Sequence, residues 1–452
     1  MFFKLLLLLV FLFPTGCASY LVVSGGAVNR EKLKEVEAGL VAVRGLKFRA
    51  EVAVEVKSAA EMKRYFEQDL EEDYGDEGLR YKSLAYAKLG LIPRGIDLKK
   101  SLVDFYSAQV VAFYDPRAKK LVMPESLAAG RVMGTVQFLG RRDVVGEMVL
   151  AHELTHALQD QHFSLGEKMR PSTEGDRDLA FRAVIEGDAT LSGFAYLFGG
   201  ADRKAVAQVN QAVQGSLREA RSTLSGMPEA IVEEMLFQYH GGVALVSGVL
   251  QERGWPAVNR FYAAPPLSTE QVLHPEKYFG VADPPTRVEL KNLPQLFQPN
   301  WKEIENDVLG ELMVEVLFKQ FFPENEAKVV AYGWDGDRFI AFSRGEEIAF
   351  VWATVWDSEQ DAEEFFRGYQ RILAKKYPGA QSAGANYLER RGQRVVVVEG
   401  LESDRVKRQI ETIWQGMELT EEPFSSPFPA LSRPLPAGTR GGYNSATEQI
   451  LP

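Results

Sequence analysis

Residues 151–157, which read A-H-E-L-T-H-A, have the types and spacing needed for metal-assisted hydrolysis. They lie in an apolar-periodic run from Val144 to Leu158, which predicts an amphipathic helix. Side chains four positions apart lie on the same face of a helix, so His152 and His156 can bind one metal ion. Glu153 then flanks the ion, where its carboxylate can take a proton from a zinc-activated water. The pattern predicts a Zn²⁺ site with Glu153 as general base.

The alternative is a helix that carries two unrelated surface histidines. The whole chain has only five histidines. Two of them at this spacing, with a glutamate between them, would be a rare coincidence in such a chain. The helical context and the spacing therefore favour the metal site.

A second helix, expected from Gly175 to Leu197, offers the third ligand. Glu186 stands among apolar neighbours there, which is costly unless the carboxylate is paired or binds a metal. Gly187 in mid-helix costs about 1 kcal/mol and indicates that another backbone approaches closely. A catalytic zinc needs three protein ligands and a water, so we expect Glu186 to be the third. The alternatives are that Glu186 is exposed or paired with Arg182.

Carboxylates near the ligands are candidates for orienting the two imidazoles, because zinc-binding histidines usually donate their second ring N–H to such a group. Asp160 lies one turn beyond His156, and Asp188 follows Glu186 by two positions. A surface salt bridge is an equally good explanation for each of them.

Composition limits the class of protein. Lys and Arg number 52 and Asp and Glu number 62, which gives a net charge of −10. This balance argues against nucleic acid and against a polybasic membrane patch as partners. A chain of 452 residues exceeds one typical core, so two domains are expected.

The first residues have the pattern of an export signal. Lys4 precedes a short apolar run from Leu5 to Phe13, which cannot span a bilayer. Cys17, the only cysteine of the chain, follows Gly16 as in a bacterial lipoprotein signal. Residues 1–17 are therefore predicted to be a lipoprotein-type signal, with a lipid on Cys17 attaching an exported protein to the membrane of the cell envelope. The alternative is an ordinary signal peptide with an incidental cysteine.

The hydrophobic patterns predict an α+β protein. Residues 21–295 are expected to form a mostly helical domain with a small N-terminal sheet, including a strand over 47–57 and a hairpin around Asp115-Pro116-Arg117-Ala118. The hairpin could pair with an extended peptide substrate, or it could be purely structural. A long helix over 228–250 is expected to break near Gly241-Gly242.

Residues 296–420 are expected to form a small α+β accessory domain. Helices are predicted over 306–322, 357–377 and 404–417, and strands over 328–332, 338–342, 348–356 and 394–399. Asp335 and Asp337, in W-D-G-D, are expected as turn formers. Residues 421–452 are rich in proline, serine and glycine and are expected to be a disordered tail.

Four motifs carry a family resemblance, and they read H-E-L-T-H-A-L-Q-D-Q-H-F, R-A-V-I-E-G-D-A-T, F-x-Y-x-x-G and S-T-E-Q-V-L-H-P-E-K-Y. Over residues 100–280 the chain resembles a bacterial exported and lipoprotein group within the gluzincin clan of zinc metallopeptidases. The resemblance implies a zincin-like domain, with zinc on His152, His156 and Glu186 and with Glu153 as base. It also implies a donor to the oxyanion of the intermediate. Tyr239 is the best match for that donor, His274 the next and His240 the third.

The expected function is zinc-dependent hydrolysis of a protein or peptide substrate in the cell envelope. Two alternatives remain open. The chain could be an envelope lipoprotein that keeps the zincin-like fold as a binding module without proteolysis, although an intact Glu153 argues against this. It could also be a zinc hydrolase acting on a non-peptide amide. Cleavage preference and oligomeric state do not follow from the sequence.

Overall fold

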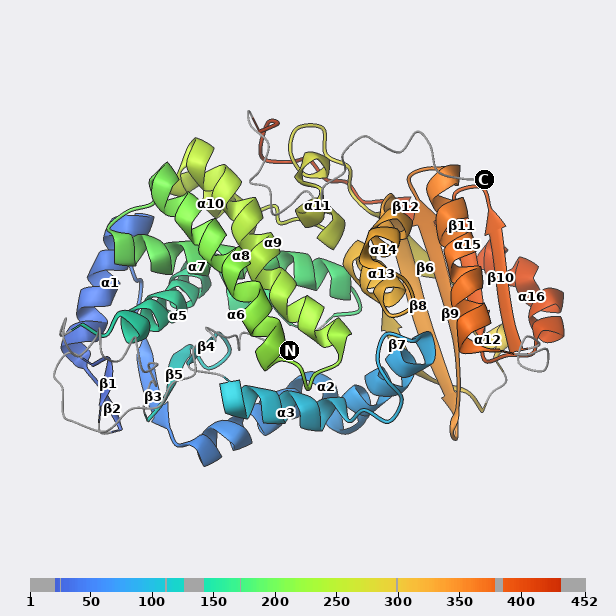
Figure 1. The fold of residues 1–452 in the computed structure, drawn as a ribbon, viewed down its shortest axis with the longest axis horizontal. Coiled ribbons are helices and arrows are strands. Elements are labelled where there is room, and N and C mark those ends of the chain that lie inside the picture. Colours follow the sequence, from blue (N-terminus) through green and yellow to red (C-terminus); the bar gives the residue numbers. More distant parts are fainter. Residues whose placement is uncertain are drawn as a thin grey trace.

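The computed structural model describes residues 21–24, 26–109, 112–125, 142–170, 172–297, 300–378 and 385–431. The fold is α+β, as the sequence predicts, with a mainly helical half on the left of Figure 1 and a half built on a five-stranded sheet on the right. No described helix is both long and apolar enough to cross a membrane. Cys17 with its signal segment, and residues 432–452 of the expected tail, lie outside the described residues.

The N-terminal part supplies a small sheet and a layer of helices. The expected hairpin is present, and its two strands pair antiparallel while a third pairs parallel, in the order β3-β5-β4. The third strand begins at Ala53 and not at Lys47 as expected. The elements are β1 (Val23–Ser24), β2 (Ala27–Val28), α1 (Arg30–Arg44), β3 (Ala53–Lys57), α2 (Ala59–Leu89), α3 (Leu98–Gln109), β4 (Phe113–Asp115) and β5 (Lys120–Pro124).

Long helices form the centre of the helical half, and α7 contacts both α5 and α9. Asp143 caps the start of α5 by accepting a hydrogen bond from the backbone N–H of Gly146, which satisfies one of the free N–H groups of the first turn. The elements are α5 (Val144–Phe163), α6 (Leu165–Lys168), α7 (Gly175–Phe198), α8 (Arg203–Thr223), α9 (Glu229–Arg253), α10 (Trp255–Val258), η1 (Asn259–Tyr262), α11 (Thr269–Leu273) and η2 (Pro275–Lys277).

Two glycines let α7 and α9 approach closely. A Cβ on Gly242 would lie 1.8 Å from the carbonyl oxygen of Ala183, and a Cβ on Gly187 would lie 2.3 Å from the carbonyl of Gly242. The close backbone approach predicted at Gly187 is therefore confirmed. The predicted break near Gly241-Gly242 is wrong, because α9 is continuous there and the contact with α7 compensates for the low helix propensity of glycine.

The C-terminal half is an antiparallel sheet in the order β10-β11-β9-β8-β7. Alternate residues face opposite layers, as the strand period requires. Phe339, Phe350 and Val397 belong to the large core that includes α13 and α15, whereas Ile340, Val351 and Val398 belong to the core with α12 and α16. The elements are β6 (Thr286–Leu290), α12 (Leu293–Leu296), β7 (Lys302–Asp307), α13 (Gly310–Lys319), α14 (Glu324–Ala331), β8 (Trp334–Arg344), β9 (Glu347–Trp356), α15 (Glu359–Lys376), β10 (Asn386–Arg391), β11 (Arg394–Glu399), α16 (Ser403–Gly416) and β12 (Met417–Glu421).

Three predictions in this half are wrong. Residues 328–332 belong mostly to helix α14, where Ala327, Val330 and Ala331 are buried at helical spacing, because a short apolar run does not distinguish helix from strand. The helix expected from residue 306 begins at Gly310, and residues 306–307 end strand β7. The W-D-G-D segment is not a turn but the start of β8, with a bulge between Trp334 and Gly336.

The two halves share one hydrophobic core and are also joined at the C-terminal end. Strand β6, which precedes the expected boundary at residue 296, pairs with β12 and packs in the C-terminal core. The first described residues of the expected disordered tail are packed as well. Phe428 is 2 % exposed and its ring contacts Phe261 and Tyr278 of the helical half. The proline-rich composition does not predict this contact, because the contact depends on two aromatic side chains, Phe424 and Phe428, that pack against rings of the helical half.

Asp337 is expected to make stability depend on pH. Its carboxylate accepts hydrogen bonds from Trp352 Nε1 (2.8 Å) and the backbone N–H of Leu309 (3.0 Å), and burial raises its pKa to about 7. Because this pKa lies above the unfolded value, the folded state keeps the proton longer, and its contribution to stability falls as pH rises from about 4 to 7. Between pH 5 and pH 8 this group should lower the free energy of unfolding of the unchanged protein by about 3 kcal/mol. Asp337→Asn has no titrating carboxyl at this position and should lack that decrease. Denaturant unfolding at both pH values measures this, and superimposable pH profiles would contradict it.

Candidate metal centre

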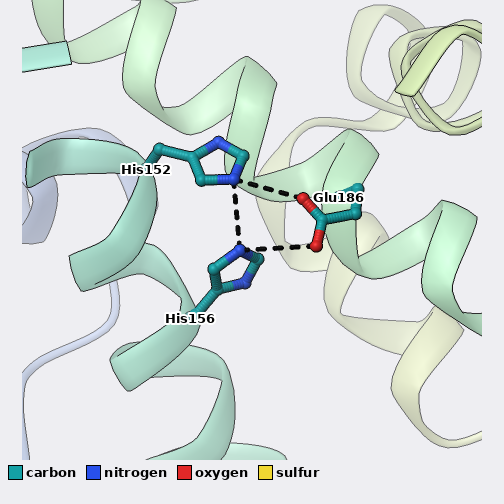
Figure 2. Close-up of side chains that lie close together, drawn as sticks. All are labelled: His152, His156 and Glu186. Atoms are coloured by element: carbon teal, nitrogen blue, oxygen red, sulfur yellow. Dashed lines mark hydrogen bonds and ion pairs between the residues drawn. The ribbon is translucent and has the colours of Figure 1, made fainter. Parts of the chain in front are cut away.

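Three side chains from two helices converge in the helical half. His152 and His156 lie on α5 and Glu186 lies on α7, as Figure 2 shows. His152 Nε2 lies 3.2 Å from His156 Nε2 and 3.2 Å from Glu186 Oε2, and His156 Nε2 lies 3.6 Å from Glu186 Oε1. The three donor atoms lie within 4.8 Å of one another, so this group could hold a metal ion. Glu186 thus faces the histidines, and the alternatives of exposure or pairing with Arg182 are not observed.

The packing of α5 against α7 holds the three ligands in place. His152, His156 and Glu186 are 3 %, 2 % and 4 % exposed. The residues around Glu186 on α7 are buried as well, which keeps bulk water away from the carboxylate. Gly187 brings α9 against α7 immediately beside Glu186. The site is therefore set by backbone packing of long helices and not by a mobile loop.

Glu153 has a fixed position next to the ligands. Its Oε2 accepts a hydrogen bond of 2.8 Å from the backbone N–H of Tyr114 on β4. Burial raises the pKa of Glu153 to about 8, and the neighbouring Glu186 carboxylate adds to that rise, while the charge of His156 and the Tyr114 N–H oppose it. A carboxyl with this pKa can both accept and release a proton near neutral pH, as a general base must.

The charges of the Glu186 carboxylate and the two imidazoles stabilise one another. Burial alone would raise the pKa of Glu186, but the imidazoles of His156 and His152 outweigh it and hold the pKa below its ordinary value. Burial lowers the pKa of His152, whereas at His156 burial is outweighed by the Glu186 carboxylate, which raises the pKa. An ionised carboxylate beside a neutral imidazole is the state in which both groups offer lone pairs to a cation.

A hydrogen-bonded chain orients His156. Its Nδ1 lies 2.8 Å from Gln159 Oε1, which can only accept, so Nδ1 carries the proton and Nε2 keeps its lone pair toward the cluster. Gln159 Nε2 in turn donates to Ile185 O and Asp188 Oδ2, both at 3.1 Å. Asp188 therefore orients the histidine through Gln159, and not directly as expected.

Asp188 is buried, and side chains distant along the chain hold it in place. Arg44 on α1 donates to its Oδ2 at 2.9 Å, and the Tyr262 hydroxyl donates to the same oxygen at 2.7 Å. The sequence analysis did not identify Gln159, Arg44 or Tyr262. Gln159 follows His156 by three positions on one helix face, which was a usable signal. Arg44 and Tyr262 carry no local signal, because they meet Asp188 only in the tertiary structure.

Gln159→Leu is expected to weaken metal binding by about 10- to 100-fold, because His156 would lose the acceptor that fixes its tautomer and ring orientation. Competition with a chromogenic chelator measures the affinity directly. Gln161→Leu is the matched control and should leave the affinity unchanged, because this half-buried side chain on the same helix bonds the backbone of Arg49 and Ala50 and not the cluster. Equal affinities of the two variants would contradict the orienting role.

Asp160 does not contact a ligating imidazole. Its Oδ2 accepts from the Tyr114 hydroxyl at 3.0 Å, and its Oδ1 accepts from the backbone N–H of Gly166 at 3.1 Å. Because the backbone N–H of Tyr114 holds Glu153, Asp160 helps to position Glu153 and not the histidines.

Tyr239 lies beside the cluster. Its ring is stacked near that of His152, with centroids 6.4 Å apart, and its buried hydroxyl lies near the Glu186 carboxylate. Burial raises its pKa well above the ordinary value, and the carboxylates of Glu186 and Glu153 add to this. The hydroxyl therefore keeps its proton at neutral pH and can donate it to a ligand in the site.

The two histidines named as further candidates are placed elsewhere. His274 Nε2 lies 2.8 Å from Glu311 Oε1 on α13, and its ring contacts Tyr332. The ring of His240 contacts Phe237, and burial lowers its pKa to about 4. No hydrogen bond or ring contact joins either one to the cluster in the described part of the chain. Of the three candidates, the structure brings only Tyr239 to the ligands.

Comparison with known proteins finds a family match for the sheet half of the chain. Residues 296–409 match the family model of a domain of unknown function, DUF8575, which covers much of the sheet half. No curated protein sequence and no solved structure matches the chain. The matched residues do not include the helical half, where the candidate metal centre lies.

Proposed function

We propose that this protein is a zinc-dependent peptidase. The observation that carries the proposal is the convergence of His152 Nε2, His156 Nε2 and the two carboxylate oxygens of Glu186. The two nitrogens are 3.2 Å apart, and each lies 3.2 or 3.6 Å from one of the oxygens, close to the separation of about 3.3 Å expected between ligand atoms around a tetrahedral zinc. Two imidazoles and one carboxylate are a donor set typical of catalytic zinc, which keeps a further position for water. Glu153 beside the ligands is the second requirement, because a purely structural site has no use for a base there.

The chain's own residues supply the remaining chemistry. A bound Zn²⁺ would act as a Lewis acid on the attacking water and the scissile carbonyl. Glu153 takes the proton of that water and delivers it to the leaving amine, while Tyr114 N–H holds Oε2 in place. The Tyr239 hydroxyl donates to the oxyanion that forms at the carbonyl, a contribution of about 3 kcal/mol in comparable sites.

Strand β4 offers a place for an extended peptide. It is an edge strand of the β3-β5-β4 sheet. The N–H of Tyr114 points to Glu153, away from β5, and in an antiparallel pair the carbonyl of the same residue points the same way. A peptide added along this edge would therefore pass the base, which supports a protein or peptide as substrate.

The signal-like residues 1–17 and Cys17 extend the proposal to location. A lipid on Cys17 would attach the exported peptidase to the cell envelope, with its site outside the cytoplasm. Radiolabelled fatty acid incorporation, compared with Cys17→Ala, tests this separately from catalysis.

The deciding experiment is cleavage of an unfolded protein by the purified protein, followed by mass spectrometry. Cleavage should cease with a chelator and return with added zinc. Activity that survives chelation would overturn the zinc mechanism. A protein that binds zinc and peptides but cleaves none would support the alternative of an envelope binding module. Turnover of non-peptide amides alone would support a zinc hydrolase that acts on such amides.

A further inference from the structure

A cavity of about 90 Å³ lies between the helical half and the sheet half. Its walls come from α2, α3, α7, α9 and the segment around the start of α13. We call it the junction cavity. Apolar side chains such as Leu179 and Ile231 line part of it. Charged side chains line another part, and they are Lys82, Asp176, Asp178, Arg182, Glu234 and Asp307.

The junction cavity lies beside α7, the helix that also carries Glu186. Arg182 and Asp178, which line it, lie one and two turns before Glu186 on the same face of α7, about 6 and 12 Å along the helix axis. A substrate side chain that extends from the cleaved bond along α7 by about one turn would meet the cavity.

Most of the charges in the junction cavity are already compensated. Lys82 Nζ lies 3.0 Å from Asp307 Oδ2 and 3.9 Å from Glu305. Asp307 also accepts from the backbone N–H of Gly175 at 2.7 Å, and Asp178 accepts from the Ser172 hydroxyl at 2.9 Å.

Glu234 is the exception. Within the part of the chain that the structure describes, no hydrogen bond or ion pair engages its carboxylate. Burial raises the pKa of Glu234, while the charges of Lys82 and Arg182 lower it without a direct contact. A desolvated carboxylate without a partner is costly, and a cation from outside would remove that cost.

We propose that the junction cavity is a subsite for a basic side chain of the peptide substrate, lysine or arginine, and that Glu234 pairs with its cationic group. The inference rests on the proposed peptidase function and names the substrate class. The apolar wall suits the aliphatic stem of such a side chain, while the carboxylate receives the charged end. Acidic groups outnumber basic ones around the cavity, which disfavours an anionic side chain.

The test compares N-acetylated peptides that differ at one position, which is lysine, norleucine or glutamate. For the unchanged protein, kcat/KM should be about 10- to 100-fold higher for lysine than for norleucine, as expected for a charge-assisted hydrogen bond. Glu234→Gln should bring this ratio close to one. Glu229→Gln, an exposed carboxylate on the same helix, is the matched control and should keep the ratio. A lysine preference that is absent, or that persists in Glu234→Gln, would overturn the proposal.

Two further arms make the test decisive. Glu234→Lys should reverse the preference toward the glutamate peptide, which a purely structural role of Glu234 would not produce. Peptides with a free amino terminus and no basic residue separate side-chain recognition from capture of a terminal amine, and a Glu234 effect confined to them would overturn the side-chain assignment.

Binding measurements distinguish a failure of this inference from a failure of the proposed function. Affinities of the same peptides for Glu153→Gln, measured by fluorescence anisotropy, should show the same order without any turnover. If no peptide is cleaved by the unchanged protein, the peptidase proposal fails, while the lysine-to-norleucine affinity ratio still decides the subsite. Equal affinities would overturn the subsite alone.

Discussion

Glu153→Gln is expected to lower peptide turnover by about 10²- to 10⁴-fold while the metal content stays the same. Glutamine keeps the size of the side chain and an oxygen that can accept from Tyr114 N–H, but it cannot take a proton. Because Glu153 is not one of the three converging ligands, binding of the ion should not change. Steady-state kinetics and elemental analysis of the same samples measure the two quantities together.

Two companion variants make the result specific. Glu186→Ala removes a ligand and should lose both metal and activity, whereas Glu167→Gln, at an exposed position soon after α5, should lose neither. Turnover by Glu153→Gln within tenfold of the unchanged protein would contradict the assignment of the base. Loss of metal in Glu153→Gln would assign Glu153 a ligand role instead.

Gly242→Ala is expected to destabilise the protein by about 3 kcal/mol or more. The added Cβ would lie 1.8 Å from the carbonyl oxygen of Ala183, which is a backbone atom of α7 and cannot turn aside as a side chain would. The two helices must therefore separate. Since α7 carries Glu186 and α9 carries Tyr239, metal affinity should fall together with stability. Denaturant unfolding and chelator competition measure the two effects.

Gly215→Ala is the matched control for this substitution. Gly215 lies inside α8, and a Cβ there meets nothing within 4 Å. Alanine has the higher helix propensity, so this variant should be stabilised by up to about 1 kcal/mol. If Gly242→Ala unfolded at the same denaturant concentration as Gly215→Ala, the close helix contact would not be a source of stability.

Local spacing accounts for the part of the site that was predictable. His152 and His156 share a face because they lie four positions apart on a helix, and this needs no knowledge of the rest of the fold. Glu186 and Gly187 could be singled out because each is unfavourable in an isolated helix, so each pointed to a partner from elsewhere. The structure supplies those partners as the histidines of α5 and the backbone of α9.

The failed predictions have a common cause. Short apolar segments such as residues 328–332 fit both a helix and a strand, and the tertiary contacts decide between the two. The glycines at 241–242 predict a helix break because the sequence does not show the backbone that packs closely against them. Asp337 was assigned to a turn because its hydrogen-bond donors, on Leu309 and Trp352, are distant along the chain.

The sequence by itself determined the chemistry at the centre of the protein: the residue types that can bind a metal, their helical spacing and the glutamate beside them. The tertiary structure alone decided which groups orient that chemistry. Tyr114 holds Glu153, Gln159 fixes the tautomer of His156, and Arg44 supports Asp188 across 144 positions of the chain. The physical reason is that helical periodicity is a local property, whereas a hydrogen bond between distant segments exists only once their helices and strands have packed together.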